Sequence, residues 1–291
     1  MQKSGMVSII GRPNAGKSTL LNALVGEKVA IVAQKPQTTR TRICGVVNRG
    51  DTQIVFIDTP GFHKPRTALG RFMTDTVRHS TSGVDCALLV VPPEPKAGPP
   101  ELLLLDKVKH LPSILVINKI DTIPKSDILA IIAAYQSLRE FGAVVPISAE
   151  KRDGLDILLD EVLKFIPEGP PLFPPDMVSD QTDEIFIAEI IREKVLRLLE
   201  HEVPHGVAVV VERLLRHDGG LIECDATVFC EKNSHKGIII GKKGEMLGNI
   251  GKLARLEIEE MYGEKVMLRL WVKIKENWRD NPGGLKNFGY M

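Results

Sequence analysis

The stretch that most constrains this chain is Gly11-Arg12-Pro13-Asn14-Ala15-Gly16-Lys17-Ser18, which is followed by Thr19. It fits the pattern G-x-x-x-x-G-K-[ST], in which two glycines let the backbone wrap closely around an anion. The run before it, residues 6–10, is apolar and rich in β-branched side chains, which predicts a buried strand. The run after it has helical spacing. This order aims backbone amides and a helix N-terminus at a phosphate group.

The same stretch predicts individual roles around a nucleoside phosphate. The Lys17 ammonium would reach the outer phosphates, and the Ser18 hydroxyl would bind Mg²⁺. The other phosphate-contacting positions that we predict in this loop are Gly11, Asn14, Ala15, Gly16 and Thr19.

Two later segments extend this site. Thr39 lies in a polar loop some twenty residues after Lys17, where its hydroxyl would bind Mg²⁺ when the loop closes over the γ-phosphate. Asp58 ends an apolar strand and would hold Mg²⁺ through water. Gly61, in the turn Asp58-Thr59-Pro60-Gly61, would offer its amide to the γ-phosphate. We therefore predict a metal site and a catalytic set: Ser18, Thr39 and Asp58 for the metal, and Lys17, Thr39 and Gly61 for catalysis.

The base is specified by a further segment, Asn118-Lys119-Ile120-Asp121, which follows the apolar strand 113–117. The Asp121 carboxylate can accept from the N1-H and the exocyclic amine of guanine, a donor pair that adenine lacks. Asn118 would fix the base edge, and the Lys119 stem would lie along its face. After the next strand, a backbone amide of Ser148-Ala149-Glu150 would meet the guanine oxygen. The expected ligands are GTP or GDP with Mg²⁺.

The motifs of the first half together resemble the translation-factor-related GTPases. This resemblance implies a mostly parallel sheet with helices on both faces and GTP at the carboxyl ends of the strands. Many GTPases place a water-orienting glutamine where this chain has Phe62, and a phenylalanine ring cannot do that. In related potassium-dependent GTPases, an asparagine at the position of Asn14 helps to hold a monovalent cation, so K⁺ is an expected second cation.

A proline- and glycine-rich stretch at 166–175 divides the chain. We predict a GTPase domain at 1–170, a linker at 171–181 and a smaller α+β domain at 182–291. The second part has the pattern of a helix at 184–200, a strand at 206–214, a strand at 222–231 with alternating polarity, two helical segments, and a last alternating strand at 266–275.

Between the two helical segments lies Ile238-Ile239-Ile240-Gly241-Lys242-Lys243-Gly244. A G-x-x-G loop in this order of elements resembles a KH domain of the bacterial type, whose loop clamps about four nucleotides of single-stranded RNA. The resemblance implies that the two glycines admit the phosphate backbone and the two lysines supply charge. The apolar residues 238–240 would lie under unstacked bases.

Charge is distributed unevenly along the second half of the chain, and its basic part is suited to nucleic-acid binding. The whole chain has a net charge of +1, but residues 232–286 hold twelve Lys/Arg against seven Asp/Glu, a net charge of +5. Residues 176–231 have a net charge of −8, from five basic and thirteen acidic residues. Four cysteines without metal spacing indicate small buried hydrophobes in a reducing compartment, so we expect a cytoplasmic location.

A GTPase domain followed by a C-terminal KH domain resembles the Era family over nearly the whole chain. The resemblance implies binding near the 3′ end of small-subunit (16S) ribosomal RNA and a role in maturation of the 30S subunit. It also implies a monomer. Two alternatives stay open at this point: a KH RNA chaperone that binds GTP with negligible hydrolysis, and a regulatory GTPase bound peripherally at the inner face of the cell membrane.

Overall fold

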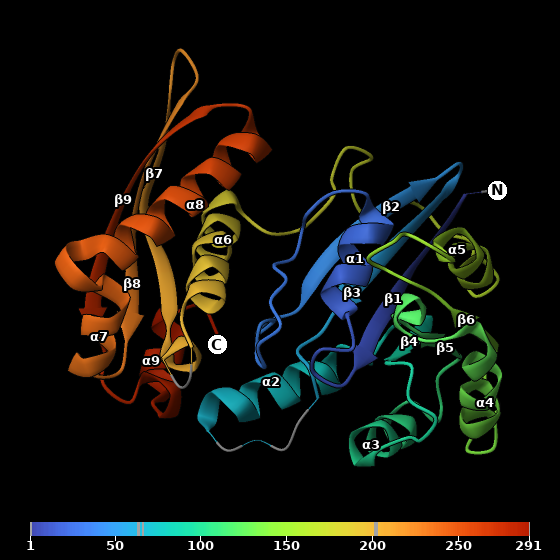
Figure 1. Ribbon diagram of the computed structural model, residues 1–291. Coiled ribbons are helices and arrows are strands. Elements are labelled where there is room, and N and C mark those ends of the chain that lie inside the picture. Colours follow the sequence, from blue (N-terminus) through green and yellow to red (C-terminus); the bar gives the residue numbers. More distant parts are fainter. Residues whose placement is uncertain (1, 63–64, 66, 201–202, 291) are drawn as a thin grey trace. The chain divides into compact units, whose positions relative to one another are not determined.

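The structure is a computed structural model that describes every residue of the 291-residue chain except 1, 63, 64, 66, 201, 202 and 291. The chain divides into two compact units, and Figure 1 shows their elements. Unit 1 contains residues up to 30, 39–65 and 70–180. Unit 2 contains 31–38, 66–69 and 181–291. Two short pieces of the N-terminal half therefore belong to the C-terminal unit.

Unit 1 is built on a six-stranded sheet with the strand order β2-β3-β1-β4-β5-β6. Only β2 runs antiparallel to its neighbour, β3, and the other described pairs are parallel. This confirms the predicted mostly parallel sheet. The strands are β1 (Lys3–Gly11), β2 (Ile43–Arg49), β3 (Thr52–Asp58), β4 (Cys86–Val91), β5 (Ser113–Ile117) and β6 (Ala143–Pro146).

Helices cover both faces of this sheet (Figure 1). Every residue of β4 is buried, and successive side chains point to opposite faces, so Leu88 packs with α1 and α5 while Leu89 packs with α2, α3 and α4. A strand that is buried on both faces has a continuous run of apolar residues, and this pattern allowed the strands to be predicted from the sequence. The helices are α1 (Lys17–Val25), α2 (Ala68–His79), α3 (Pro99–Lys107), α4 (Lys125–Gln136) and α5 (Leu155–Leu163).

The proline-rich stretch 92–100 is a loop for most of its length, but its last two prolines begin helix α3. A proline at the first helical positions loses no intrahelical hydrogen bond, and its fixed φ suits a helix. Glu101 then accepts from the Gly98 amide at 3.0 Å, which completes the N-terminal cap of α3.

The stretch predicted as a linker lies along the edge of the sheet in unit 1. Gln53 of β3 binds the backbone of Leu172 and Phe173 through three hydrogen bonds of 2.7–2.9 Å. Farther along, the Val46 amide of β2 donates to the Val178 carbonyl at 2.9 Å. The chain from 172 to 180 therefore covers the free edge of β2, where unpaired backbone groups would otherwise face solvent.

Unit 2 has the order helix, two strands, two helices and strand, and a short C-terminal helix follows. Its sheet order is β7-β8-β9, with β7 and β8 antiparallel and β8 and β9 parallel. Its core includes Cys224 and Cys230, whose thiols are fully buried and unpaired by disulfides, as the sequence predicted. The main elements are α6 (Asp183–Leu198), β7 (Ala208–His217), β8 (Leu221–Cys230), α7 (Asn233–Ile240), α8 (Glu245–Tyr262), β9 (Lys265–Ile274) and α9 (Pro282–Asn287).

Helix α6 buries charged residues as well as the predicted apolar ones. Glu193 is fully buried and accepts from the Val32 amide at 2.8 Å, while Arg192 donates to the Thr38 carbonyl. Both partners belong to segment 31–38, which packs within unit 2. Buried charges of this kind need hydrogen-bonding partners, and the backbone of an irregular segment supplies them.

Candidate functional site

The loop 11–18 joins β1 to α1; space requires a glycine at both of its ends, and at Gly16 the backbone conformation requires one as well. A Cβ on Gly11 would lie 2.4 Å from the Val90 carbonyl oxygen of β4. Gly16, the N-cap of α1, has φ of 92°, and a Cβ there would lie 2.2 Å from the Asn118 side-chain nitrogen. Any side chain at either position would push the loop away from its neighbours.

The Lys17 side chain is almost fully buried inside this loop. Its ammonium donates to the carbonyl oxygens of Gly11 and Arg12, both at 3.2 Å. Burial lowers the pKa of Lys17, and the nearby Asp58 carboxylate counteracts this shift. A phosphate anion in the loop would give this desolvated ammonium a stronger, charged acceptor.

Three oxygen-bearing side chains meet beside Lys17. Ser18 Oγ donates to Asp58 Oδ2 at 2.6 Å and lies 2.9 Å from Thr39 Oγ1. Asp58 is fully buried; its Oδ1 has no hydrogen-bond partner among the described residues, and burial raises the pKa of this carboxyl. Two hydroxyls and an under-satisfied carboxylate are hard oxygen ligands, and this set fits Mg²⁺.

Asn118, which we predicted at the base edge, is held in the structure by hydrogen bonds to neighbouring loops. Its side chain is buried, and its amide nitrogen donates to the Ala15 carbonyl at 2.9 Å. Its amide oxygen accepts from the backbone amides of Lys119 at 2.8 Å and Ala149 at 3.0 Å. Asn118 therefore ties three loops together, and here the Ala149 amide serves that connection instead of facing solvent.

The next residues of this segment do face outward. The Lys119 ammonium donates to the Asn14 carbonyl at 2.8 Å, so its stem runs across the phosphate loop. Asp121 is exposed in a short 3-10 turn at the carboxyl end of β5. The buried Ser148 accepts from the Lys151 amide at 3.1 Å and shapes the turn after β6. The predicted base-binding residues thus come together at one edge of the sheet.

Gly61 and Phe62 lie directly against the beginning of the phosphate loop. A Cβ on Gly61 would be 2.7 Å from the Pro13 Cα, and the Phe62 amide donates to the Gly11 carbonyl at 3.2 Å. The Phe62 ring packs among apolar side chains, with the Lys107 ammonium 4.4 Å from its centre. The ring is therefore occupied by packing, as expected of a side chain that does not orient water. Residues 63 and 64, which follow, lie outside the described part of the chain.

In unit 2 the G-x-x-G loop joins α7 to α8. Gly241 has φ of 74° and Gly244 has φ of 82°, and a Cβ on Gly241 would lie 2.6 Å from Met246 Cβ. Lys242 and Lys243 between them are exposed. Space around Gly244 is open, and the N-terminal amides of the long helix α8 follow at once. This is a suitable place for a backbone phosphate.

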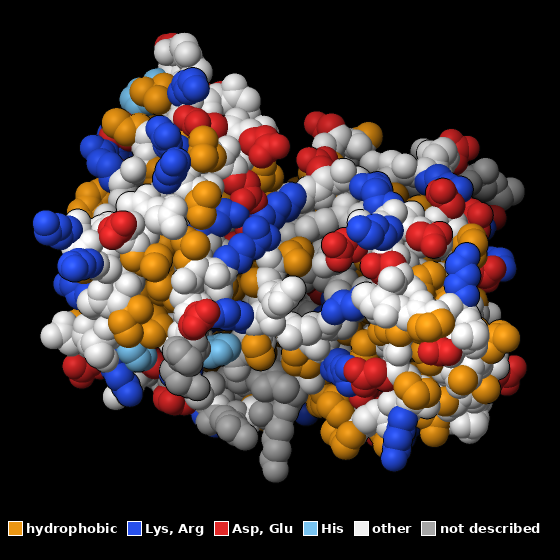
Figure 2. All heavy atoms as spheres, in the orientation of Figure 1, with side chains coloured by type: hydrophobic (Ala, Val, Ile, Leu, Met, Phe, Trp, Pro, Cys, Tyr) orange, Lys and Arg blue, Asp and Glu red, His pale blue; other side chains and the backbone are white. Residues whose placement is uncertain are grey.

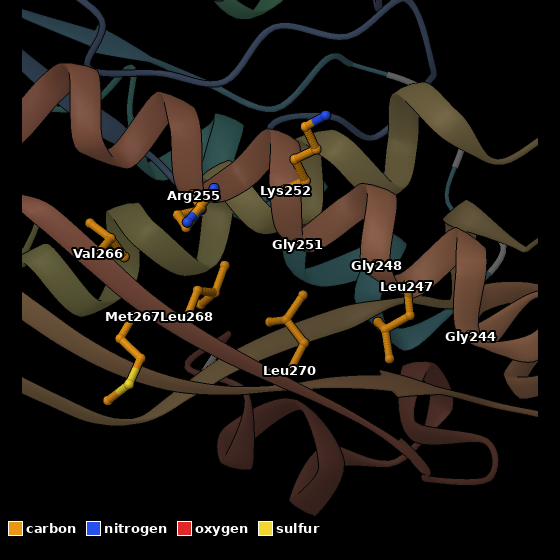
Figure 3. A pocket seen from close by; sticks show the side chains of 10 residues that line it. All are labelled: Gly244, Leu247, Gly248, Gly251, Lys252, Arg255, Val266, Met267, Leu268 and Leu270. Carbon is orange, nitrogen blue, oxygen red and sulfur yellow. The ribbon is translucent and has the colours of Figure 1, made fainter.

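Beside this loop, a groove of about 700 Å³ runs between α8 and β9. Figure 3 shows Leu247, Leu268 and Leu270 between helix and strand, with Lys252 projecting away from the strand. Lys252 and Arg255 are basic residues three apart on the helix, so they lie on the same face. Figure 2 shows Lys and Arg side chains gathered around the N-terminal end of α8, next to hydrophobic ones. The sequence analysis missed this groove, although the basic pair at helical spacing was a usable signal.

The three isoleucines before the loop are not equivalent. Ile239 is fully buried in the core of unit 2, and Ile240 packs against that core. Ile238 is 49% exposed and lines a second groove, which also includes Gly241 and Lys242 of the G-x-x-G loop. This corrects the expectation of an apolar surface from 238 to 240, because a helix turns successive side chains to different faces.

Two family models match separate parts of the chain. The family described as 50S ribosome-binding GTPase matches residues 6–119, and the KH domain family matches residues 202–279. Fold and site together define a GTP-hydrolysing P-loop protein with an attached KH domain.

Similarity over the full length narrows this class. The chain is 49% identical to GTPase Era of Ruminiclostridium cellulolyticum over 99% of its own length and 97% of that protein. It is 47% identical to GTPase Era of Caldanaerobacter subterraneus, covering 99% and 98%. The chain belongs to the Era family of GTPases.

Solved structures of the family agree with this assignment. One is Era in complex with MgGDPNP and nucleotides 1506–1542 of 16S ribosomal RNA, with a TM-score of 0.96 and 40% identity over the whole of both chains. Another is an Era variant of Aquifex aeolicus bound to GDP and AlF4⁻, with a TM-score of 0.96 and 39% identity over the same coverage. GTP or GDP and Mg²⁺ are the ligands of this enzyme.

Proposed function

We propose that this GTPase is a nucleotide-controlled RNA-binding protein that holds the 3′ region of 16S ribosomal RNA and assists maturation of the 30S subunit. The observation that carries the proposal is the groove between α8 and β9, which begins at a G-x-x-G loop and is flanked by basic residues. Support comes from the full-length similarity to Era bound to nucleotides 1506–1542 of 16S ribosomal RNA.

In the nucleotide site, the residues of this chain act by position and charge. The backbone amides from Asn14 to Thr19 surround the phosphates. The Lys17 ammonium exchanges its hydrogen bonds to the Gly11 and Arg12 carbonyls for hydrogen bonds to phosphate oxygens. Ser18 and Thr39 bind Mg²⁺ directly, and Asp58 holds it through water. Bound Mg²⁺ supplies charge neutralisation at the β- and γ-phosphate oxygens.

The Gly61 amide faces the γ-phosphate, and backbone groups position the attacking water because Phe62 is packed away. The side-chain oxygen of Asn14 would help to hold a K⁺ ion, which would add positive charge near the phosphates. At the base, Asp121 selects guanine, and Asn118 keeps the surrounding loops in place through its three hydrogen bonds.

In the RNA site, Gly241 and Gly244 admit the phosphate backbone to the loop and to the N-terminus of α8. Lys242 and Lys243, together with Lys252 and Arg255 of α8, provide the charge. Ile238 and the leucines of the groove contact unstacked bases, whose faces are apolar.

The finer organisation of the molecule is part of the same proposal. We assign residues 1–170 to the GTPase function, 171–181 to the connection and 182–291 to the KH function, and we expect a cytoplasmic monomer. None of the described helices is long and apolar enough to cross a membrane. Co-sedimentation with vesicles tests a peripheral association.

The deciding experiment is an RNA-binding titration with the full-length protein. A fluorescent RNA of the 16S 3′-terminal sequence should bind more tightly than a scrambled RNA of the same length. Affinity should also differ between the protein loaded with a non-hydrolysable GTP analogue and the protein loaded with GDP. Equal binding of both RNAs in both nucleotide states would overturn the proposal.

A further inference from the structure

Arg12 lies within the phosphate loop, but its side chain points to the loop after β4 and to helix α3. Its guanidinium hydrogen-bonds to Glu94, and its Nε lies 3.5 Å from Glu101 Oε1. The two carboxylates differ sharply in environment, since the side chain of Glu94 is 52% exposed and that of Glu101 is 2% exposed. An exposed ion pair contributes little, whereas a buried carboxylate depends strongly on its partners.

The two carboxylate oxygens of Glu101 have different neighbours. Oε2 accepts from the Gly98 amide at 3.0 Å, within the N-terminal cap of α3. Oε1 has no hydrogen-bond partner among the described residues, so the ion pair with Arg12 is the interaction that compensates its burial. Glu101 therefore connects the beginning of the phosphate loop to the first turn of helix α3.

The anchored segment contacts Gly61 and Phe62, and the proposed function places Gly61 at the γ-phosphate. Pro13, next to Arg12, lies against Gly61, and Gly11 accepts from the Phe62 amide at 3.2 Å. Helix α3 touches this side as well, because Lys107 in its last turn lies over the Phe62 ring. Helix α3 thus contacts the beginning of the phosphate loop through its first turn and the segment after Asp58 through its last turn. These contacts help to fix the two segments relative to each other.

We propose that Glu101 is a positioning residue for GTP hydrolysis, acting through Arg12 and Pro13 on the placement of Gly61. The inference rests on the proposed role of the Gly61 amide at the γ-phosphate. GDP lacks that phosphate and uses the later part of the loop, from Asn14 onward. Loss of the Glu101 charge should therefore slow hydrolysis of GTP while leaving GDP affinity almost unchanged, since only the transferring phosphoryl group depends on Gly61.

The test variant is Glu101→Gln, which keeps the side-chain shape and the acceptor for Gly98 but removes the charge opposite Arg12. We expect kcat to fall on the order of tenfold, with the KM for GTP and the Kd for GDP within about twofold of wild type. The matched control is Glu94→Gln, which neutralises the exposed partner and should change kcat by less than about twofold. Thermal unfolding of each variant checks folding.

A double variant gives an independent readout. If Glu101 acts through Arg12, the change Glu101→Gln should lower kcat far less in an Arg12→Gln background than in wild type. Additive losses would overturn the proposal, and so would an unchanged kcat or a loss of GDP affinity that equals the loss of kcat. RNA binding by Glu101→Gln should match that of wild type, because the substitution lies outside the RNA site. If the wild-type protein itself bound no RNA, the proposed RNA-binding function would be refuted, while the role of Glu101 in hydrolysis would be unaffected.

Discussion

At the scale of single residues, Asn118 and Asp121 show how neighbours in one motif divide their tasks. Asn118 is buried, and its amide group hydrogen-bonds to three loops, while Asp121, three residues farther along the chain, is exposed at the same sheet edge. The inward residue holds the surrounding loops together, and we propose that the outward residue selects the base. Their substitutions should therefore have different signatures.

Asp121→Asn should weaken GTP binding and admit xanthine nucleotides. The new amide cannot accept from both the N1-H and the amine of guanine, but it can donate to the additional oxygen of xanthine. Competition titrations with GTP and XTP measure the change. Asp127→Asn, the same change of charge at an exposed position of α4, is the control and should leave base preference as it is. An unchanged GTP affinity in Asp121→Asn would contradict the assignment.

Asn118→Ala should lower both nucleotide affinity and the free energy of unfolding. The substitution leaves the Ala15 carbonyl and the Ala149 amide without their partner, and each unpaired buried group costs about 1–3 kcal/mol. Urea unfolding followed by circular dichroism measures this loss. A variant that retains full stability but binds no nucleotide would show that Asn118 contacts the base directly instead.

At the scale of elements, the loop between α7 and α8 is expected to bind RNA in two ways. Its glycines leave space for the phosphate backbone, and its lysines supply positive charge. Gly241→Asp adds bulk beside Met246 at φ of 74° and places a negative charge against phosphate, so RNA binding should be nearly abolished. Gly237→Ala, in open space within α7, is the control for a substituted glycine. Thermal unfolding separates a blocked loop from a disrupted fold.

Replacing Lys242 and Lys243 together with alanine should weaken RNA binding without blocking the loop. The log–log dependence of affinity on salt should become shallower by roughly 0.7 for each phosphate contact that is lost. Anisotropy titrations at several KCl concentrations give this slope. A salt dependence identical to that of wild type would mean that these lysines do not meet phosphate.

At the scale of the whole molecule, the chain forms two compact units with separate cores, so damage to the RNA loop should not reach the nucleotide site. GTP hydrolysis measured without RNA should be the same in wild type, in Gly241→Asp and in the double lysine variant. Any stimulation by RNA should disappear together with RNA binding. A drop in RNA-free turnover in folded variants would contradict this independence.

Much of the fold and of the nucleotide site could be predicted from the sequence, because these features depend on residues that are close together in the chain. The loop 11–18 carries its own glycines, lysine and hydroxyl, and the apolar strand and helix on either side follow from hydrophobic spacing. The strand-turn pattern of the second half likewise led to the KH fold, and the carboxylate of Asp121 led to the prediction of guanine as the base.

Tertiary structure alone decided where side chains point and which distant segments meet. It turned Asn118 inward, buried Ile239, laid residues 172–180 along β2 and brought Glu101 to Arg12 across 89 positions of sequence. Each of these depends on burial and on partners supplied by other strands and helices, whose positions are fixed only when the sheet is assembled. A sequence pattern identifies the residues of such contacts, but the packed fold determines their partners.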